Sequence, residues 1–68
     1  MVKCHLSKLM GERKLRISDL ARETAINRNT ITRLYHETAT RVDLDNISVL
    51  CDFFECEVGD LFEHVPEK

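Results

Sequence analysis

Apolar residues recur at helical spacing in five short stretches of this chain. This spacing is typical of amphipathic helices, and it predicts helices over about 2–13, 17–24, 28–36, 44–54 and 58–63. No convincing alternation of the kind found in β-strands is present. The chain is therefore predicted to be all-α, a single domain over residues 1–68 built from five short helices, with a candidate disordered tail at 64–68.

The same spacing selects the residues that should face the core. In chain order the predicted inner residues are Val2, Leu6, Leu9 and Met10; Ile17, Leu20, Ala21 and Thr24; Ile31, Leu34 and Tyr35; Leu44, Ile47, Leu50, Cys51 and Phe54; and Val58, Leu61 and Phe62, with the stem of Arg13 at the edge of the first stripe. Capping residues predict three helix starts. Asn27 and Asp43 can accept hydrogen bonds from the first-turn amides, and Asp19 can bond back to the amide of residue 16.

The size and composition of the chain argue against several classes of protein. Its 68 residues contain no apolar run near membrane-spanning length and no signal-peptide pattern, so a cytoplasmic location is expected. Cys4, Cys51 and Cys56 lack the close pairing of a zinc site, and they are expected to be small core residues. No catalytic set or phosphate-binding glycine loop is found, and neither an enzyme nor a bound cofactor is expected.

Charge is divided unevenly along the chain. Residues 1–41 hold nine Lys or Arg and four Asp or Glu, a net charge of +5, whereas residues 42–68 hold one Lys and eight acids, a net charge of −7. These values agree with the overall charge of −2. The division suggests one face for a polyanion and another turned away from it.

A short break interrupts the helical pattern between Leu20 and Leu34, at the segment "TAINRNT". Two helices of eight or nine residues joined by a tight turn near residues 25–27 are typical of a helix-turn-helix. The second helix carries polar residues on the face opposite Ile31 and Leu34: Arg28, Asn29, Thr32, Arg33 and His36. Arg can bind guanine in a bidentate manner, Asn can do the same with adenine, and Thr can contact a thymine methyl group.

The whole segment "ISDLARETAINRNTITRLYHE" resembles the helix-turn-helix of the phage Cro and repressor family, also called XRE-like regulators. The matching features are Leu20-Ala21, Ile26, Asn27 as the cap, and Thr30, Ile31 and Thr32. The flanking segments "HLSKLMGERKL" and "RVDLDNISVLCDFFECEVGDLFE" resemble the first helix and the last two helices of the small single-domain branch of the family. The resemblance covers about residues 2–63, and it implies a DNA-binding fold of five helices.

The resemblance also implies roles for individual residues. Base-reading side chains would be Arg28, Asn29, Thr32 and Arg33, and phosphate contacts would come from Thr30, His36, Thr40 and Arg41. Many members have Gln at the position of Ile17, which cannot make that hydrogen bond, and Arg16 is the expected substitute for a phosphate contact. Many members have glycine at the positions of Lys14, Ala25 and Glu55, where left-handed backbone would be strained.

Two functions remain open at this point. The first is a transcriptional repressor that binds double-stranded DNA as a homodimer, on two half-sites about one DNA turn apart. Its dimer contact would be sought among Phe53, Phe54, Phe62 and Val65, although core packing is an equal alternative for Phe54 and Phe62. The second is a protein-interaction module, such as an antitoxin-like regulatory subunit, that uses the acidic C-terminal half.

Overall fold

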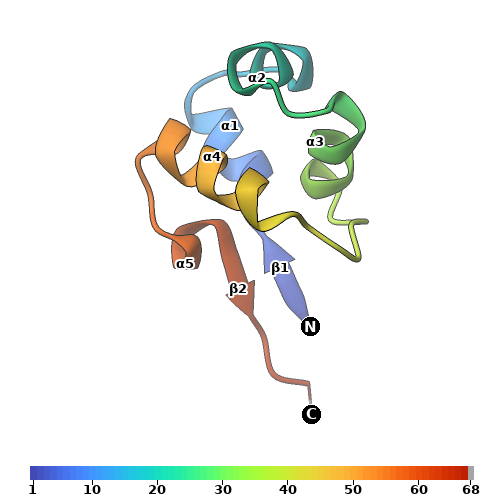
Figure 1. Ribbon diagram of the computed structural model, residues 1–68. Coiled ribbons are helices and arrows are strands. Elements are labelled where there is room, and N and C mark those ends of the chain that lie inside the picture. The colour runs from blue at the N-terminus through green and yellow to red at the C-terminus, as the bar shows by residue number, and fades with distance from the viewer. Residues whose placement is uncertain (68) are drawn as a thin grey trace.

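The computed structural model describes residues 1–67 and shows helices stacked above a small two-stranded sheet (Figure 1). The elements in chain order are β1 (Val2–Cys4), α1 (Leu6–Glu12), α2 (Ile17–Thr24), α3 (Arg28–Tyr35), α4 (Leu44–Phe54), α5 (Val58–Leu61) and β2 (Phe62–His64). The prediction of a mostly helical fold with five short helices is confirmed. The bounds predicted for α2 and α4 agree with the structure, and α3 ends one residue earlier than predicted.

One apolar core lies between the helices. Its fully buried side chains come from every helix: Leu6, Met10, Leu20, Ile31, Leu50 and Leu61. Cys4, Ile26, Leu34 and Phe54 complete the buried set. Helical phase therefore predicted all six fully buried side chains correctly, because apolar residues at helical spacing share one face of a helix.

The sheet is the main departure from the all-α prediction. β1 and β2 pair antiparallel, with Val2 opposite His64, Lys3 opposite Glu63 and Cys4 opposite Phe62. The predicted first helix therefore begins at Leu6 instead of residue 2, and the predicted last helix ends at Leu61 instead of residue 63. Each strand has only three residues, too few to show alternation, and the two strands lie at opposite ends of the sequence.

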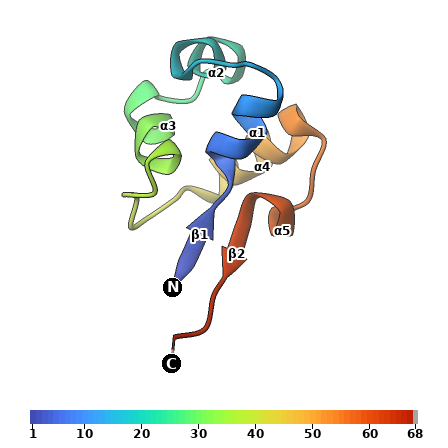
Figure 2. The same cartoon turned by 180° about the vertical axis from the view of Figure 1, so that it is seen from behind.

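The segment proposed as a disordered tail begins inside the sheet. His64 belongs to β2, and the amide of Val65 donates to the carbonyl oxygen of Met1 at 2.8 Å. The N-terminal ammonium donates in turn to the carbonyl oxygen of Val65, also at 2.8 Å. The structure thus gives positions for residues 64–67 of that segment, whereas Lys68 lies outside the described residues. Figure 2 shows β1 and β2 beside each other below the helices.

Three residues predicted to face the core are exposed instead. Leu44 is 79% exposed, Val2 is 63% exposed and Val58 is 54% exposed. Leu44 and Val58 are the first residues of α4 and α5, where the helix begins at the rim of the core. Val2 lies in β1, so its match to the helical stripe is accidental. Periodicity gives the direction of a side chain but not whether the core extends that far along the element.

The predicted caps are confirmed. The Asn27 side chain accepts a hydrogen bond from the amide of Asn29 at 2.7 Å, and Asp43 accepts from the amide of Asp45 at 3.4 Å. Asp19 Oδ2 accepts from the amide of Arg16 at 3.0 Å, so it satisfies the start of α2 in place of the missing cap side chain.

Arg13 joins α1 to the end of α4. Its guanidinium donates to the carbonyl oxygens of Phe53 and Phe54 at 3.1 and 3.2 Å, and it lies 5.1 Å from the centre of the Phe54 ring. A cation at a helix C-terminus satisfies open carbonyl groups and offsets the negative end of the helix dipole. Arg13 therefore stabilises the fold. Its charge, one of the nine basic charges of the N-terminal half, lies at the C-terminus of α4.

Among residues 1–67, four residues other than glycine have left-handed backbone: Lys14, Ala25, Glu37 and Glu55, with φ between 52° and 59°. Three of them are the positions where many family members have glycine. The sequence left open whether these turns differ from those of the family or are strained, and the structure has left-handed backbone at all three. Each lies just after a helix. The amide that follows Lys14, Glu37 and Glu55 donates to an open carbonyl of the preceding helix, whereas the amide that follows Ala25 donates to the hydroxyl of Thr24. A Cβ in this conformation costs about 1–2 kcal/mol per residue.

Ala25→Gly is expected to leave the domain equally stable or up to about 1 kcal/mol more stable. Glycine removes the strain of about 1–2 kcal/mol at φ 59° but makes the unfolded chain more flexible, at about 0.4–1 kcal/mol. Ala25→Val should be clearly less stable than wild type, because a β-branched residue tolerates positive φ poorly. Thermal melts of the three proteins measure the difference. A large loss for Ala25→Gly would contradict strain at the turn.

Candidate nucleic-acid interface

The turn between α2 and α3 is fixed by both polar and apolar contacts. The hydroxyl of Thr24 donates to the carbonyl oxygen of Leu20 at 2.7 Å and accepts from the amide of Ile26 at 3.3 Å. Ile26 is buried and Ala25 reverses the chain direction in the left-handed conformation. The turn is therefore anchored in the core on both sides of Ala25, and it sets the orientation of α3 relative to α2.

α3 presents one apolar side to the domain and one polar side to solvent. Ile31 is fully buried and Leu34 nearly so. The side chains of Arg28, Asn29, Arg33 and His36 are exposed, whereas Thr30 and Thr32 are half-buried. The Thr32 hydroxyl donates to the carbonyl oxygen of Arg28 at 2.9 Å, which leaves its methyl group and its acceptor lone pairs for other contacts.

The start of α3 is the part best suited to a base edge. Asn27 satisfies one of the first amides, and Arg28 and Asn29 follow it in the first turn. Residues near the N-terminus of such a helix reach deepest into a major groove, and the positive helix end favours nearby phosphate. The exposed donors of α3 can thus form bidentate hydrogen bonds with guanine or adenine.

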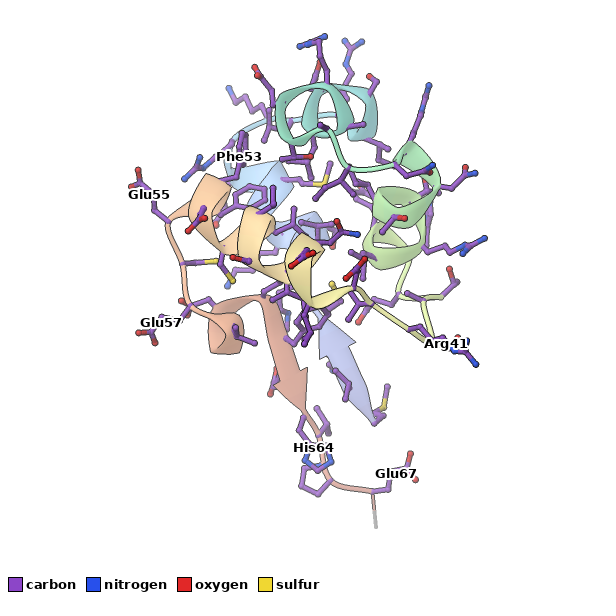
Figure 3. The ribbon with its side chains drawn as sticks, in the orientation of Figure 1. Arg41, Phe53, Glu55, Glu57, His64 and Glu67 are labelled. Atoms are coloured by element: carbon purple, nitrogen blue, oxygen red, sulfur yellow. The ribbon has the colours of Figure 1, made fainter. Side chains whose placement is uncertain are left out.

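The residues predicted to contact phosphate lie on three segments. Thr30 and His36 lie on or directly after α3, Thr40 and Arg41 lie in the α3–α4 loop (residues 37–43), and Arg16 precedes α2. Arg16, His36, Thr40 and Arg41 are exposed. Arg41 points outward on the same side of the molecule as α3 (Figure 3). Arg41 therefore extends the polar surface of α3 beyond the helix itself, into the loop.

The acidic half of the chain mostly lies elsewhere. All eight acids of residues 42–67 are exposed, and Glu55 and Glu57 lie on the side of the molecule opposite Arg41 and α3 (Figure 3). Glu63 is paired with His5, with 2.9 Å between Oε1 and Nε2. Asp43 and Asp45 are exceptions, since Asp43 caps α4 next to the loop and Asp45 lies in the first turn of the helix. Glu55 and Glu57 are thus separated in space from Arg41 and α3.

One residue near this surface was not predicted to have a role. Glu37 follows α3, and its Oε1 accepts a hydrogen bond from the backbone amide of Cys4 at 3.0 Å. The two residues are 33 positions apart, and neither carries a local pattern that predicts the contact. Together with burial, the carboxylate of Glu37 also raises the pKa of the Cys4 thiol, and burial is the larger cause.

The described residues offer little for other kinds of site. Within residues 1–67 no group of three His, Cys, Asp or Glu side chains is placed to hold a metal ion, and no helix there could span a membrane. Cys4 is buried and Cys51 and Cys56 are half-buried, in keeping with core residues. Burial raises the pKa of the Cys56 thiol, and the adjacent Cys51 adds to this effect. The exposed donors of α3 are thus the best-supported candidate site.

Comparison with known proteins agrees with this geometry. The family described as "Cro/C1-type HTH DNA-binding domain" matches residues 5–67, nearly the whole chain. A search of curated proteins gave no significant match.

Proposed function

Because the chain belongs to the Cro/C1-type helix-turn-helix family of DNA-binding domains, we propose that it is a sequence-specific transcriptional regulator, and specifically a cytoplasmic repressor. The observation that carries this proposal is the outer face of α3, which presents exposed Arg and Asn side chains over a fully buried Ile31. The match is to a family of DNA-binding domains and not to a family of enzymes.

In this proposal α3 is the helix that enters the major groove. Its base-reading residues are Arg28, Asn29, Thr32 and Arg33. The surrounding residues Arg16, Thr30, His36, Thr40 and Arg41 contact phosphate oxygens, which fix the orientation of the domain on the duplex without reading sequence. Support comes from the exposure of Arg28, Asn29, Arg33 and Arg41.

A two-fold dimer on paired half-sites completes the proposal. One α3 of eight residues is only about 12 Å long, so a single domain reads too few base pairs for useful specificity. Of the four residues considered for the dimer contact, Phe54 is buried and Phe53 packs against Arg13. Phe62 is half-buried opposite Cys4 and packs against the core, whereas half-buried Val65 pairs with Met1 at the end of the sheet where Met1 and Val2 are exposed. This apolar end of the sheet is the better candidate contact.

The main alternative is a protein-interaction module that uses the exposed acids of α4, α5 and β2. Salt dependence separates the two functions. Phosphate contacts release counterions, so six to ten of them should lower DNA affinity by about 10³–10⁵ between roughly 50 and 200 mM salt. Titration of labelled duplex DNA by fluorescence anisotropy gives this slope. Affinity that is weak and independent of salt would favour the alternative.

Arg41→Ala should weaken binding to all duplex sequences about equally and reduce the salt slope by roughly one unit per chain. The reason is that an exposed Arg in the loop can neutralise a phosphate but does not lie on α3. Lys3→Ala is the matched control, because Lys3 is an exposed cation in β1, outside the proposed interface. An equal change in slope for both variants would show that only total charge matters.

A further inference from the structure

We propose that Glu37 is a positioning residue that ties the end of α3 and the α3–α4 loop to β1, and so holds Thr40 and Arg41 in place for DNA. This inference rests on the proposed function, since it concerns how the phosphate-contacting loop is kept in position. Glu37 itself contacts no DNA in this account. Its side chain acts through the backbone of Cys4.

The backbone of Glu37 ends the recognition helix. At φ 57°, Glu37 lets its own amide donate to the carbonyl oxygen of Leu34 at 3.2 Å, and the amide of Thr38 donates to Arg33 at 2.9 Å. These two bonds close the C-terminus of α3 and start the loop in a fixed direction. The carboxylate of Glu37 then accepts a hydrogen bond from the amide of Cys4 at 3.0 Å. One residue therefore connects the recognition helix, the loop and the sheet.

The amide of Cys4 needs this acceptor because of the strand register. Met1 bonds to Val65, and the amide of His5 donates to the carbonyl oxygen of Leu61 at 2.8 Å. The backbone amide and carbonyl groups of alternate β1 residues thus point toward β2. The amide of Cys4 lies between them in the alternation, and it points away from β2, to the open edge of the strand. Cys4 is only 8% exposed, so an unpaired amide there would be buried without a partner.

The rest of the loop is held mainly by two apolar side chains. Ala39 and Val42 are half-buried and pack against the core. Residues 39–42 also line a hollow of about 280 Å³ together with Val2 and Ile47, and side chains that face such a hollow lose close-packed neighbours on that side. The hydrogen bond from Cys4 to Glu37 adds a polar anchor at the first residue of the loop, directly before the stretch that lines the hollow.

Glu55 provides an internal comparison. It has φ 52° just after α4, and the bonds around it repeat those at Glu37, with Glu55 donating to Asp52 at 3.3 Å and Cys56 donating to Cys51 at 3.0 Å. Glu55 is exposed, and the hydrogen bonds found within residues 1–67 include none to its carboxylate. Glycine would relieve the backbone strain at both positions. Only at residue 37 would it also remove a side-chain acceptor that is used in a hydrogen bond.

The test compares Glu37→Gly, Glu37→Gln and Glu55→Gly with wild type. DNA affinity is measured by anisotropy, and amide exchange and backbone relaxation are measured by NMR without DNA. Glu37→Gly should bind duplex DNA about tenfold more weakly, exchange the Cys4 amide faster and show greater motion over residues 38–42. Glu37→Gln keeps an amide oxygen as acceptor and should bind within about twofold of wild type, as should Glu55→Gly.

Two results would overturn the proposal: unchanged Cys4 exchange and loop motion in Glu37→Gly, or a loosened loop with wild-type DNA affinity. Should Glu37→Gly fail to fold, Glu37→Asn replaces it, because Asn tolerates left-handed backbone and its shorter side chain lacks the reach of Glu. Failure of wild type to bind any duplex would instead refute the proposed function, and the NMR comparison would still decide whether Glu37 holds the loop.

Discussion

Leu20→Ala, Ile31→Ala and Leu50→Ala should each lower the free energy of unfolding by about 2–5 kcal/mol. All three side chains are fully buried in one core, on α2, α3 and α4 respectively. Removing their methyl groups loses transfer free energy and leaves a cavity that neighbouring helices fill only in part. A core in a domain below about 70 residues rarely supplies more than about 3–5 kcal/mol, so each loss is a large part of the total stability of the domain.

Urea melts followed by circular dichroism measure these losses. Leu44→Ala is the matched control, since Leu44 is also a leucine of α4 but is exposed, and it should change stability by no more than about 0.5 kcal/mol. Comparable losses for Leu44→Ala and Leu50→Ala would show that the core does not lie where the structure places it.

Arg28→Ala and Arg33→Ala should each lose about 1–3 kcal/mol of discrimination at particular base pairs. Both side chains are exposed on the outer face of α3, where a guanidinium can bind guanine in a bidentate manner. The affinity of each variant for mismatched duplexes should fall much less than its affinity for the preferred sequence. This pattern distinguishes them from Arg41→Ala, whose effect should be uniform.

Competition titrations with single base-pair changes measure this discrimination. For each variant, the preference among the four base pairs should flatten at one position in each half-site and persist at the others. A loss of affinity that is the same for every duplex would place Arg28 and Arg33 on phosphate instead of bases, and another element would then have to read the sequence.

Local pattern was enough to predict most of the helical fold. The start of α3 could be predicted because Asn27 is a strong cap and because Ile31 and Leu34 share one face of a short helix. The outer face of α3 followed from the same phase. The family resemblance marked Lys14, Ala25 and Glu55 as candidate left-handed positions, which no periodicity in this chain would reveal, but it did not indicate Glu37.

The remaining features depend on contacts between residues distant in sequence. β1 and β2 stabilise each other through pairing between residues 2–4 and 62–64. Neither strand is long enough to be predicted from its own sequence pattern. Arg13 contacts carbonyl groups of Phe53 and Phe54, and Glu37 contacts the amide of Cys4. Every residue type carries a backbone carbonyl group, and every type except proline carries an amide hydrogen. The sequence therefore does not indicate which backbone group a distant side chain will contact.

The central claim is that α3 reads the base sequence of DNA, and selection from a pool of random duplexes at one fixed salt concentration tests it most directly. Wild type should enrich two related half-sites with centres about one helical turn, roughly 10 base pairs, apart. The double variant Arg28→Ala/Arg33→Ala should lose the enrichment at specific positions of each half-site. A wild-type pool without a common sequence, or the same enriched sequence with both arginines removed, would contradict the claim.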